Sequence, residues 1–405
     1  MAAAASFLFA VHPLLTEAVS WVSGGPYSQS AFFFLLSFLL YILAKSKPRL
    51  IWISVVSFTF AVLSSEKALS LFLVFILFEL SFGEFKRNWK KMLPYLSLGA
   101  LLAVVLFAKI SYRMKSVQAM SYDAGGMDNP LLQIPSAFGR FSKLLIWPYQ
   151  LTLYETFSDF RWSGYFLDVF LLLAILGAII YGYRKNKKIF FWFSFTVASL
   201  LPILTPFRLG WWAAERYIYI GSLGFFVLVA MLFSRWLEHE KLKKFAWSIF
   251  IFIILALSAR TIARNFEWKN EDTLWEATAK YSEKEQKSHN NMGEVYARQG
   301  DMEKSVEEFK IAIEINPRYG DAYYNLAKTL NQMGKTSEAI ENYNKAVQFN
   351  PGLWQAYYNM GMIFAGQERY NEAKVQFQKV LDLEPENADA KINLEKINSI
   401  LQEEK

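Results

Sequence analysis

A step of 34 residues recurs in the last third of this 405-residue chain and limits its possible folds more than any other feature. The step relates prolines, small or apolar residues and aromatic rings in three successive units. The related sets are Pro317, Pro351 and Pro385; Gly293, Ala327 and Gly361; Ser305, Ala339 and Ala373; Ala312, Ala346 and Val380; and Phe309, Tyr343 and Phe377. A fixed period of this kind predicts pairs of antiparallel helices that stack on their neighbours, whereas a helical bundle without repeats would not generate it.

This period is typical of the tetratricopeptide repeat, whose units stack into an α-solenoid. The sequence predicts a connecting helix over residues 264–285, followed by three repeats and a capping helix over 286–405. Arrays of this kind are docking surfaces for other proteins. The repeats therefore predict protein–protein interaction, and the partner has to be inferred from the rest of the chain.

Asparagine recurs with the same step in the first helix of each unit and in the capping helix. The four positions are Asn291, Asn325, Asn359 and Asn393. First helices line the concave face of such arrays, and a side-chain amide can both donate to and accept from a peptide backbone. The arrangement resembles the asparagine ladder of the O-GlcNAc transferase repeats, which holds an acceptor polypeptide. The alternative is that each asparagine bonds locally within the repeats.

Residues 1–263 are chemically different, because apolar runs long enough to span a bilayer as helices (about 16–20 residues) recur there. We expect spans near residues 29–45, two short ones within 50–83, then 92–110, 164–183, 189–206, 217–234 and 246–263, with a shorter embedded or interfacial helix at 138–153. The predicted fold is all-α: a polytopic transmembrane helical domain over 1–263, followed by the tetratricopeptide α-solenoid. The chain has no cysteine, which excludes disulfides, cysteine-ligated zinc and thiol catalysis.

Four basic clusters follow the apolar runs, at residues 45–49, 86–91, 184–188 and 235–244. The formal net charge of +7 belongs mainly to such clusters, so it indicates orientation in a lipid bilayer and no nucleic-acid partner. All four clusters are cytoplasmic if the segment 138–153 does not cross the membrane, and two are outside if it does. If the segment 138–153 does not cross, the repeats lie on the exoplasmic or periplasmic side, together with most polar motifs of the first domain.

Polar residues near the apolar runs could carry chemistry, and each has a structural alternative. Glu17, close to His12, could act as a base, orient a substrate or bind a metal, or else could form an N-cap or interfacial pair with Thr16. Glu66 and Lys67 interrupt an apolar stretch, where ionisable residues are costly, and could face a cavity or neutralise each other.

Two further segments contain an arginine that could bind a ligand. Arg140, in the short embedded segment, could bind a phosphate bidentately or extend to the membrane surface. Glu215, Arg216 and Tyr217 combine an ion pair with an aromatic anchor of the kind found at membrane interfaces. The sequence contains no glycine-rich phosphate loop, no Ser-His-Asp arrangement and no zinc-ligand spacing, so we predict no metal site.

The order of these motifs resembles that of a known family. The residues that carry the resemblance are His12-Pro13, Thr16-Glu17-Ala18-Val19 and Gly24; Asp128-Asn129-Pro130; Arg140; Trp147-Pro148, Leu151 and Tyr154; Ala214-Glu215-Arg216-Tyr217 and Tyr219; and Arg264, Trp268 and Leu274 ahead of the repeats. Over nearly its whole length the chain resembles the transmembrane-and-tetratricopeptide O-mannosyltransferases of the C-type glycosyltransferase superfamily. It looks like a bacterial relative, which implies the inner (cytoplasmic) membrane.

The resemblance implies that a sugar, mannose in this family, is transferred from a polyprenyl-phosphate carrier to protein serine or threonine on the exoplasmic side. Arg140 and Arg216 would then contact the donor phosphate. Glu17 with His12 would serve the acceptor or the base, and Glu66 is a third catalytic candidate. Glu215, Tyr217 and the four asparagines would bind substrate. Apart from the lipid-linked sugar no cofactor is implied, and a requirement for a divalent metal is left open.

Two departures from the family pattern qualify this reading. The family's presumed base lies in an outer loop that precedes the segment where this chain begins, and Gly25 stands where the family tends to have arginine. We therefore expect an N-terminally incomplete gene product or a non-catalytic relative. The alternative function is a membrane-anchored scaffold that assembles envelope proteins through its repeats. A transporter is a more distant alternative, since no inverted repeat is evident.

Overall fold

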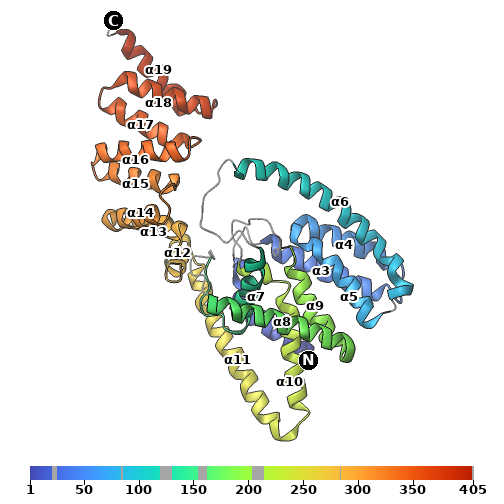
Figure 1. Cartoon of the computed structure of the whole chain (residues 1–405). Helices are drawn as coiled ribbons and strands as arrows, with labels where there is room; N and C mark the ends of the chain where they lie inside the picture. The colour runs from blue at the N-terminus through green and yellow to red at the C-terminus, as the bar shows by residue number, and fades with distance from the viewer. Residues whose placement is uncertain are drawn as a thin grey trace. The chain divides into compact units, whose positions relative to one another are not determined.

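A computed structural model describes residues 1–20, 25–83, 85–118, 130–153, 162–202, 214–282 and 284–403, without the side chains of residues 66, 103, 106–118 and 130. The regular structure in these ranges is helical, as the sequence predicts (Figure 1). The described residues up to Leu274 form one compact unit, and those from Trp275 onward form a second. The division falls within the segment predicted to connect the two domains.

The helices of the first unit overlap the predicted spans, although several of their bounds differ. They are α1 Ala2–Val11, α2 Thr16–Ser20, α3 Gly25–Leu43, α4 Leu50–Ser64, α5 Phe72–Phe82, α6 Phe85–Gln118, α7 Pro130–Ile146, α8 Trp162–Lys185, α9 Lys187–Leu200, α10 Ser222–Leu237 and α11 Glu240–Glu267. Short 3₁₀ turns η1 Pro13–Leu15, η3 Glu66–Leu71 and η4 Glu215–Ile218 interrupt them, and α12 spans Glu271–Ala279.

Three of these helices are long and apolar enough to cross a membrane: α3, α8 and α11. A fourth span is present if α1 and residues Pro13–Ser20, which meet at an angle of 62°, count as one broken segment. The bend follows from Pro13, which cannot donate a backbone hydrogen bond and restricts the preceding residue to an extended conformation. His12 accordingly has φ −82° and ψ 123°.

The predicted break between two short apolar helices is confirmed. α4 ends at Ser64, Ser65 is extended, and α5 begins only after the turn η3. The segment predicted to be too short for a span is α7, which ends at Ile146, two residues before Pro148. Several of its buried hydrophobic side chains recur at helical spacing, so one face of α7 packs inward; they are Ala137, Phe138, Phe141, Leu144 and Leu145.

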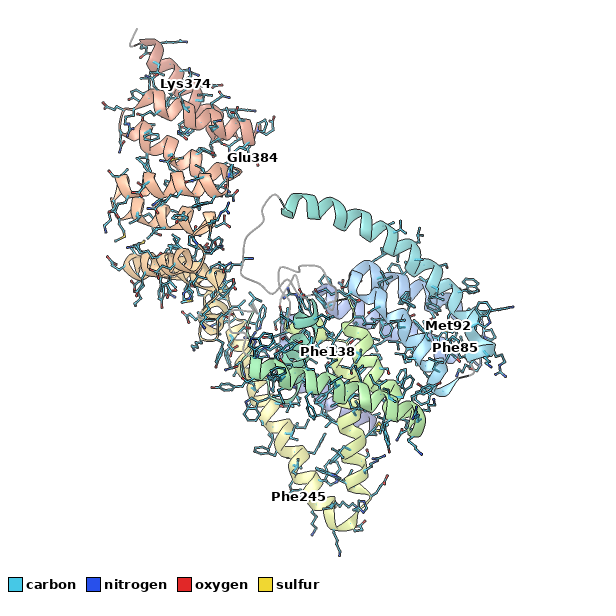
Figure 2. All side chains as sticks on the ribbon, in the orientation of Figure 1. Phe85, Met92, Phe138, Phe245, Lys374 and Glu384 are labelled. Atoms are coloured by element: carbon cyan, nitrogen blue, oxygen red, sulfur yellow. The ribbon has the colours of Figure 1, made fainter. Side chains whose placement is uncertain are left out.

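Phenylalanine side chains fill much of the interior of the first unit. Figure 2 labels one of the buried ones, Phe138 of α7. Phe34, Phe58, Phe75 and Phe191 come from four different helices and pack into one cluster. On α8, by contrast, Phe170 is 69% exposed, and the most apolar stretch of this helix is only 6% buried. Such a surface is stable in lipid rather than in water, which supports α8 as a membrane span.

The second unit contains the three predicted repeats and the capping helix. Its helices are α13 Gln286–Gln299, α14 Met302–Ile315, α15 Gly320–Gln332, α16 Thr336–Phe349, α17 Trp354–Gly366, α18 Tyr370–Leu383 and α19 Ala388–Glu403. The small residues lie where two helices of one repeat cross. A Cβ atom on Gly293 would come within 2.5 Å of Cε1 of Phe309, so the close approach requires the glycine.

Candidate functional site

Polar motif residues of the first unit lie together in one buried cluster, although they are far apart in sequence. The cluster is formed by the bend after α1, the loop after α7, the turn η4 and the last turns of α11. The carbonyl oxygen of Val11 accepts a hydrogen bond of 2.6 Å from the Thr261 hydroxyl, which joins the first and the last of these segments.

Glu17 and Arg216 form the first ion pair of the cluster. Oε2 of Glu17 accepts a hydrogen bond of 2.7 Å from the backbone N–H of Arg216, and Oε1 accepts one from Nη1 of the same residue. The side chains are only 1% and 6% exposed, respectively. Burial lowers the pKa of the Arg216 guanidinium, but the Glu17 carboxylate, together with Tyr217 and Tyr27, more than offsets this and raises the pKa above its ordinary value.

The second part of the cluster is a chain of four alternating charges. Nη2 of Arg264 lies 2.9 Å from Oε1 of Glu215, and Nη1 of Arg264 lies 2.5 Å from Oε2 of Glu267. Arg260 then donates to the other oxygen of Glu267 at 3.0 Å. The Arg264 side chain is completely buried, and a buried charge is tolerated only when it is paired in this way. Glu215 is therefore held in an ion-pair network.

Three arginines donate to three successive backbone carbonyls in the loop after α7. Arg260 donates to Tyr149 at 3.3 Å, Arg140 to Gln150 at 2.8 Å and Arg264 to Leu151 at 3.3 Å. Arg140 thus fixes the path of this loop. The spacing of four residues between Arg260 and Arg264 places both on one face of α11, a signal that could have indicated their shared role.

Both ring nitrogens of His12 contact the backbone, so this residue has a structural role as well. Its Nδ1 accepts a hydrogen bond of 3.3 Å from the backbone N–H of Leu14, and its Nε2 lies 3.1 Å from the carbonyl oxygen of Leu145. Because Nδ1 is an acceptor, Nε2 is the protonated nitrogen, and the neutral imidazole satisfies both contacts. The ring is 2% exposed and caps the turn η1.

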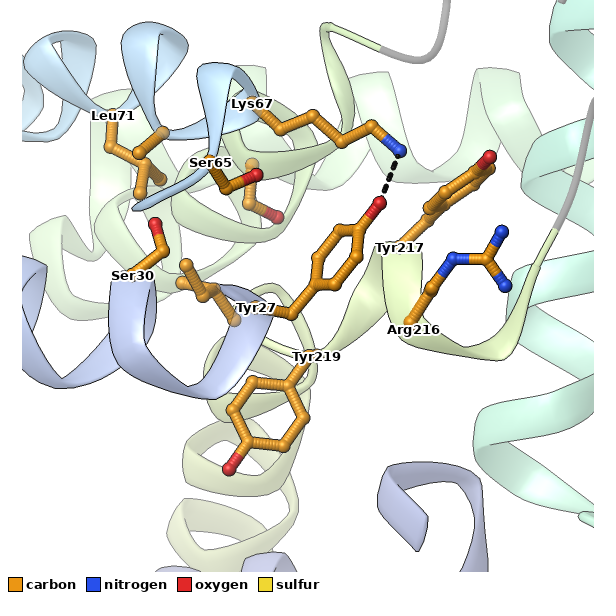
Figure 3. A pocket seen from close by; sticks show the side chains of 11 residues that line it. Tyr27, Ser30, Ser65, Lys67, Leu71, Arg216, Tyr217 and Tyr219 are labelled. Atoms are coloured by element: carbon orange, nitrogen blue, oxygen red, sulfur yellow. Dashed lines mark hydrogen bonds between the residues drawn. The ribbon is translucent and has the colours of Figure 1, made fainter. Parts of the chain in front are cut away.

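A small cavity lies beside this cluster (Figure 3). Its volume is about 20 Å³, enough for about one water molecule, and Tyr27, Ser65, Lys67, Arg216 and Tyr217 are among the residues that line it. The Lys67 ammonium donates to the Tyr27 hydroxyl at 3.0 Å and lies 3.1 Å from the centre of the Tyr217 ring. Cζ of Arg216 lies 5.0 Å from the centre of the same ring.

The structure thus brings together part of the predicted site. Arg216 and Tyr217 line the cavity, and Glu17 binds Arg216. His12, Arg140 and Glu215 are not among the residues described as lining it. The Glu66 side chain lies outside the described part of the chain, as do Gly24, Asp128, Asn129 and Tyr154. Lys67, which the sequence suggested could face a cavity or neutralise Glu66, lines this cavity, but it was not among the predicted binding residues.

No group of three or more histidine, aspartate or glutamate side chains with metal-binding geometry occurs among the described residues. Nor does an aspartate or glutamate occur among the described residues that line the cavity. The described charges facing this space are cationic, which favours an anionic ligand.

The asparagines of the second unit connect neighbouring repeats. Nδ2 of Asn325 donates to Oδ1 of Asn290 at 3.0 Å, Nδ2 of Asn359 to the Tyr324 hydroxyl at 3.4 Å, and Nδ2 of Asn393 to the Tyr358 hydroxyl at 3.2 Å. Each bond spans 35 residues and runs to the preceding repeat. These three amides thus bond within the repeats, which the sequence offered as the alternative to binding a polypeptide. Their carbonyl oxygens accept no hydrogen bond from a described residue.

Comparisons with known proteins agree with both units. Profiles of the tetratricopeptide repeat family match residues 285–351 and 354–387. The crystal structure of MamA is similar, at 23% identity and a TM-score of 0.28, over 32% of this chain and 78% of that one.

Three curated relatives extend beyond the repeats. The human protein O-mannosyl-transferase TMTC3 is 27% identical over 368 residues, which are 80% of this chain and 40% of that protein. Protein O-mannosyl-transferase F38B6.6 of Caenorhabditis elegans is 26% identical over 79% of this chain and 46% of its own length. Human TMTC4, also named a protein O-mannosyl-transferase, is 25% identical over 75% of this chain and 47% of its own length.

The resemblance predicted from the motifs is thus confirmed: homologues over about 80% of the chain are proteins named as O-mannosyl-transferases. The chain spans less than half the length of these relatives.

Proposed function

We propose that this chain is a membrane glycosyltransferase that transfers a sugar from a polyprenyl-phosphate carrier to a serine or threonine of a protein. The names of its homologues make mannose the expected sugar. The cavity at Arg216 and Lys67 is the observation that best supports a phosphate-bearing donor, because two cationic side chains border it.

In the proposed reaction the hydroxyl oxygen of the acceptor bonds to the anomeric carbon of the sugar. The bond from this carbon to the phosphate oxygen breaks, and the lipid phosphate leaves with the electron pair. The proton of the hydroxyl passes to a base. Cations beside the phosphate stabilise the negative charge that develops on the leaving group, which is an effective way to lower such a barrier.

Glu17 fits a positioning role better than that of the base. Both of its oxygens accept hydrogen bonds from Arg216, so protonating the carboxylate would break the ion pair that holds the guanidinium. His12, with both ring nitrogens engaged by the backbone, is a positioning residue in the same sense. Glu66 stays a candidate base from the sequence alone.

We further propose that the repeats bind the acceptor polypeptide on the exoplasmic or periplasmic side of a bacterial inner membrane. The side follows from the positions of the basic clusters and the bacterial source from the resemblance. On the repeats, the carbonyl oxygens of Asn325, Asn359 and Asn393 can accept hydrogen bonds from the N–H groups of an extended peptide, while their amide nitrogens bind the neighbouring repeat.

The scaffold function is the second candidate, and one observation favours it. Among the described residues that line the cavity none is a carboxylate that could act as a base. A protein without a base could still bind partner proteins through its repeats.

Sugar transfer by the purified full chain separates the two functions. The chain would be reconstituted in vesicles with radiolabelled polyprenyl-phosphate mannose and a serine- and threonine-rich polypeptide. Incorporation of label into the polypeptide, and its loss in a folded Arg216→Gln variant, is the expected result. A folded protein that transfers no label but binds the polypeptide would establish the scaffold instead.

A further inference from the structure

We propose that a groove between α4 and α6 binds one anionic glycerophospholipid of the bilayer, with the headgroup at Lys90 and an acyl chain along the apolar residues that follow it. The groove has a volume of about 710 Å³, within the usual range of ligand pockets. The described residues that line it are Trp52 of α4 and Lys90, Leu93, Pro94, Leu96 and Ser97 of α6. None of them lines the cavity beside η4, and the lipid proposed here is not the sugar donor.

The first turns of α6 have an inward and an outward face. Met92, which Figure 2 labels near the start of this helix, and Tyr95 are buried in the cluster that contains Phe58 and Phe75. Leu93 lies one residue beyond Met92 and is 45% exposed. The inward face therefore holds α6 on the core, whereas the outward face is apolar and uncovered, a surface that is stable against lipid.

The outward residues of α6 change from charged to apolar along the helix. Lys90, Pro94 and Ser97 are separated by four and three residues, so they form one stripe with Leu93 between its turns. The Ser97 hydroxyl donates to the Pro94 carbonyl at 3.2 Å, so it needs no water in an apolar environment. The stripe thus has a cation at one end and apolar surface beyond it, which is the order of headgroup and acyl chain in a phospholipid.

Trp52 forms the opposite wall of the groove, on a helix that contacts α6. Trp52 and Lys90 both lie within the first two turns of their helices. α4 begins directly after the basic cluster 45–49, and the cluster 86–91 contains Lys90. The indole of Trp52 is 65% exposed, and tryptophan favours the level of the lipid headgroups. The charged end of the groove is therefore expected at the membrane surface predicted to be cytoplasmic.

The charge at this end favours an anionic lipid over a neutral one. The Lys90 side chain is exposed and forms no hydrogen bond or ion pair with another described residue. Basic residues beside the ends of membrane helices attract anionic headgroups at the cytoplasmic surface. A free phosphate would use the ammonium alone, whereas a phospholipid uses both the ammonium and the apolar stripe. We therefore assign the groove to a phospholipid.

Native mass spectrometry of the full chain released from detergent micelles tests this assignment. The probes are phosphatidylglycerol and phosphatidylcholine with identical acyl chains. We expect the parent chain to bind phosphatidylglycerol about fivefold more tightly than phosphatidylcholine, and Lys90→Gln to abolish this preference, because one lysine near the membrane surface contributes a factor of about this size. Lys90→Arg keeps the charge and should keep the preference.

Lys91→Gln is the matched control for charge. Lys91 is the next residue of the same basic cluster and is also exposed, but it does not line the groove. Its substitution should change the phosphatidylglycerol affinity by less than about twofold. Equal losses in Lys90→Gln and Lys91→Gln would mean a general attraction to the basic cluster and would overturn the proposal.

Ser97→Trp tests the apolar part of the groove without changing a charge. The indole would fill the stripe, so binding of both phospholipids should weaken about threefold or more. Unchanged binding in this variant would show that no acyl chain lies there. Polyprenyl monophosphate is the last probe: if it binds more tightly than phosphatidylglycerol and depends on Lys90, the groove belongs to the donor lipid and the proposal is wrong.

Discussion

Glu17 and Arg216 are 199 residues apart in the chain, yet the Glu17 carboxylate binds both the backbone N–H and the guanidinium of Arg216 in a buried ion pair. The pair joins the bend after α1 to the turn η4. It therefore fixes one wall of the cavity that Arg216 lines. Its strength determines whether the candidate site keeps its shape.

Replacing Glu17 should destabilise the first unit strongly. Removing one partner of a buried ion pair leaves an uncompensated charge, which typically costs about 3–5 kcal/mol. We expect Glu17→Ala to lower the free energy of unfolding by about 3–5 kcal/mol. Denaturation of the full chain in detergent micelles measures this change. Glu17→Ala combined with Arg216→Met removes both charges and should recover part of the loss; equal stability of the single and double variants would contradict an ion pair.

Arg264 should be the most sensitive arginine of α11. Its side chain is completely buried and contacts Glu215, Glu267 and the Leu151 carbonyl, so Arg264→Met would strand Glu215 at a cost of about 3–5 kcal/mol. Arg260 is 20% exposed and shares Glu267, and Arg260→Met should cost about 1 kcal/mol. Thermal unfolding of the two variants compares their stabilities directly. Similar losses of stability would contradict a larger contribution from Arg264 than from Arg260.

The sequence could predict the elements but not their pairing. Local chemistry determines the bend at Pro13 and the break near Ser65, and the break occurs where expected. The membrane count placed Glu17 and Arg216 near the same surface, but no pattern relates two residues so distant to each other. The same holds for Lys67: the fold places its ammonium on the Tyr217 ring, and no sequence pattern relates these two residues.

The repeats illustrate what periodicity can and cannot predict. The 34-residue step identified the small residues and the aromatic rings, which the structure places against each other, as at Gly293 and Phe309. It also showed that Asn325 and Asn359 occupy equivalent positions. The step says nothing about which way an amide turns, because the donor groups find partners in the preceding repeat that differ between units, Asn290 in one and Tyr324 in the next.

Glycine substitutions should separate tight from open positions in the repeats. A Cβ on Gly293 would lie 2.5 Å from the Phe309 ring, on Gly361 3.0 Å from the Phe377 ring, and on Gly366 more than 4 Å from any neighbour. We expect Gly293→Ala to cost about 1–3 kcal/mol, Gly361→Ala less, and Gly366→Ala less than about 0.5 kcal/mol. Hydrogen exchange of the α13–α18 amides ranks the stabilities of the three variants. A Gly366→Ala variant as unstable as Gly293→Ala would contradict the expected ranking.

Tyr343 should make the stability of the repeats depend on alkaline pH. Its hydroxyl lies 3.2 Å from Nδ2 of Asn359, and burial of the ring raises the pKa of the hydroxyl above its ordinary value of 10.0. The folded state therefore keeps a proton that the unfolded chain releases above about pH 10. This contribution to stability is complete below that pH and is lost as the pH rises toward the folded-state pKa.

Tyr343→Phe tests this dependence and the role of Asn359 together. Without the hydroxyl, the loss of stability between pH 9 and pH 11, followed by hydrogen exchange of α15–α18, should become smaller than in the parent chain. The missing hydrogen bond should cost about 1 kcal/mol at neutral pH. Binding of an extended polypeptide to the full chain should persist in Tyr343→Phe, which keeps the Asn359 carbonyl oxygen, and weaken in Asn359→Ala, which removes it. Equal binding by both variants would mean that Asn359 serves only to join the repeats.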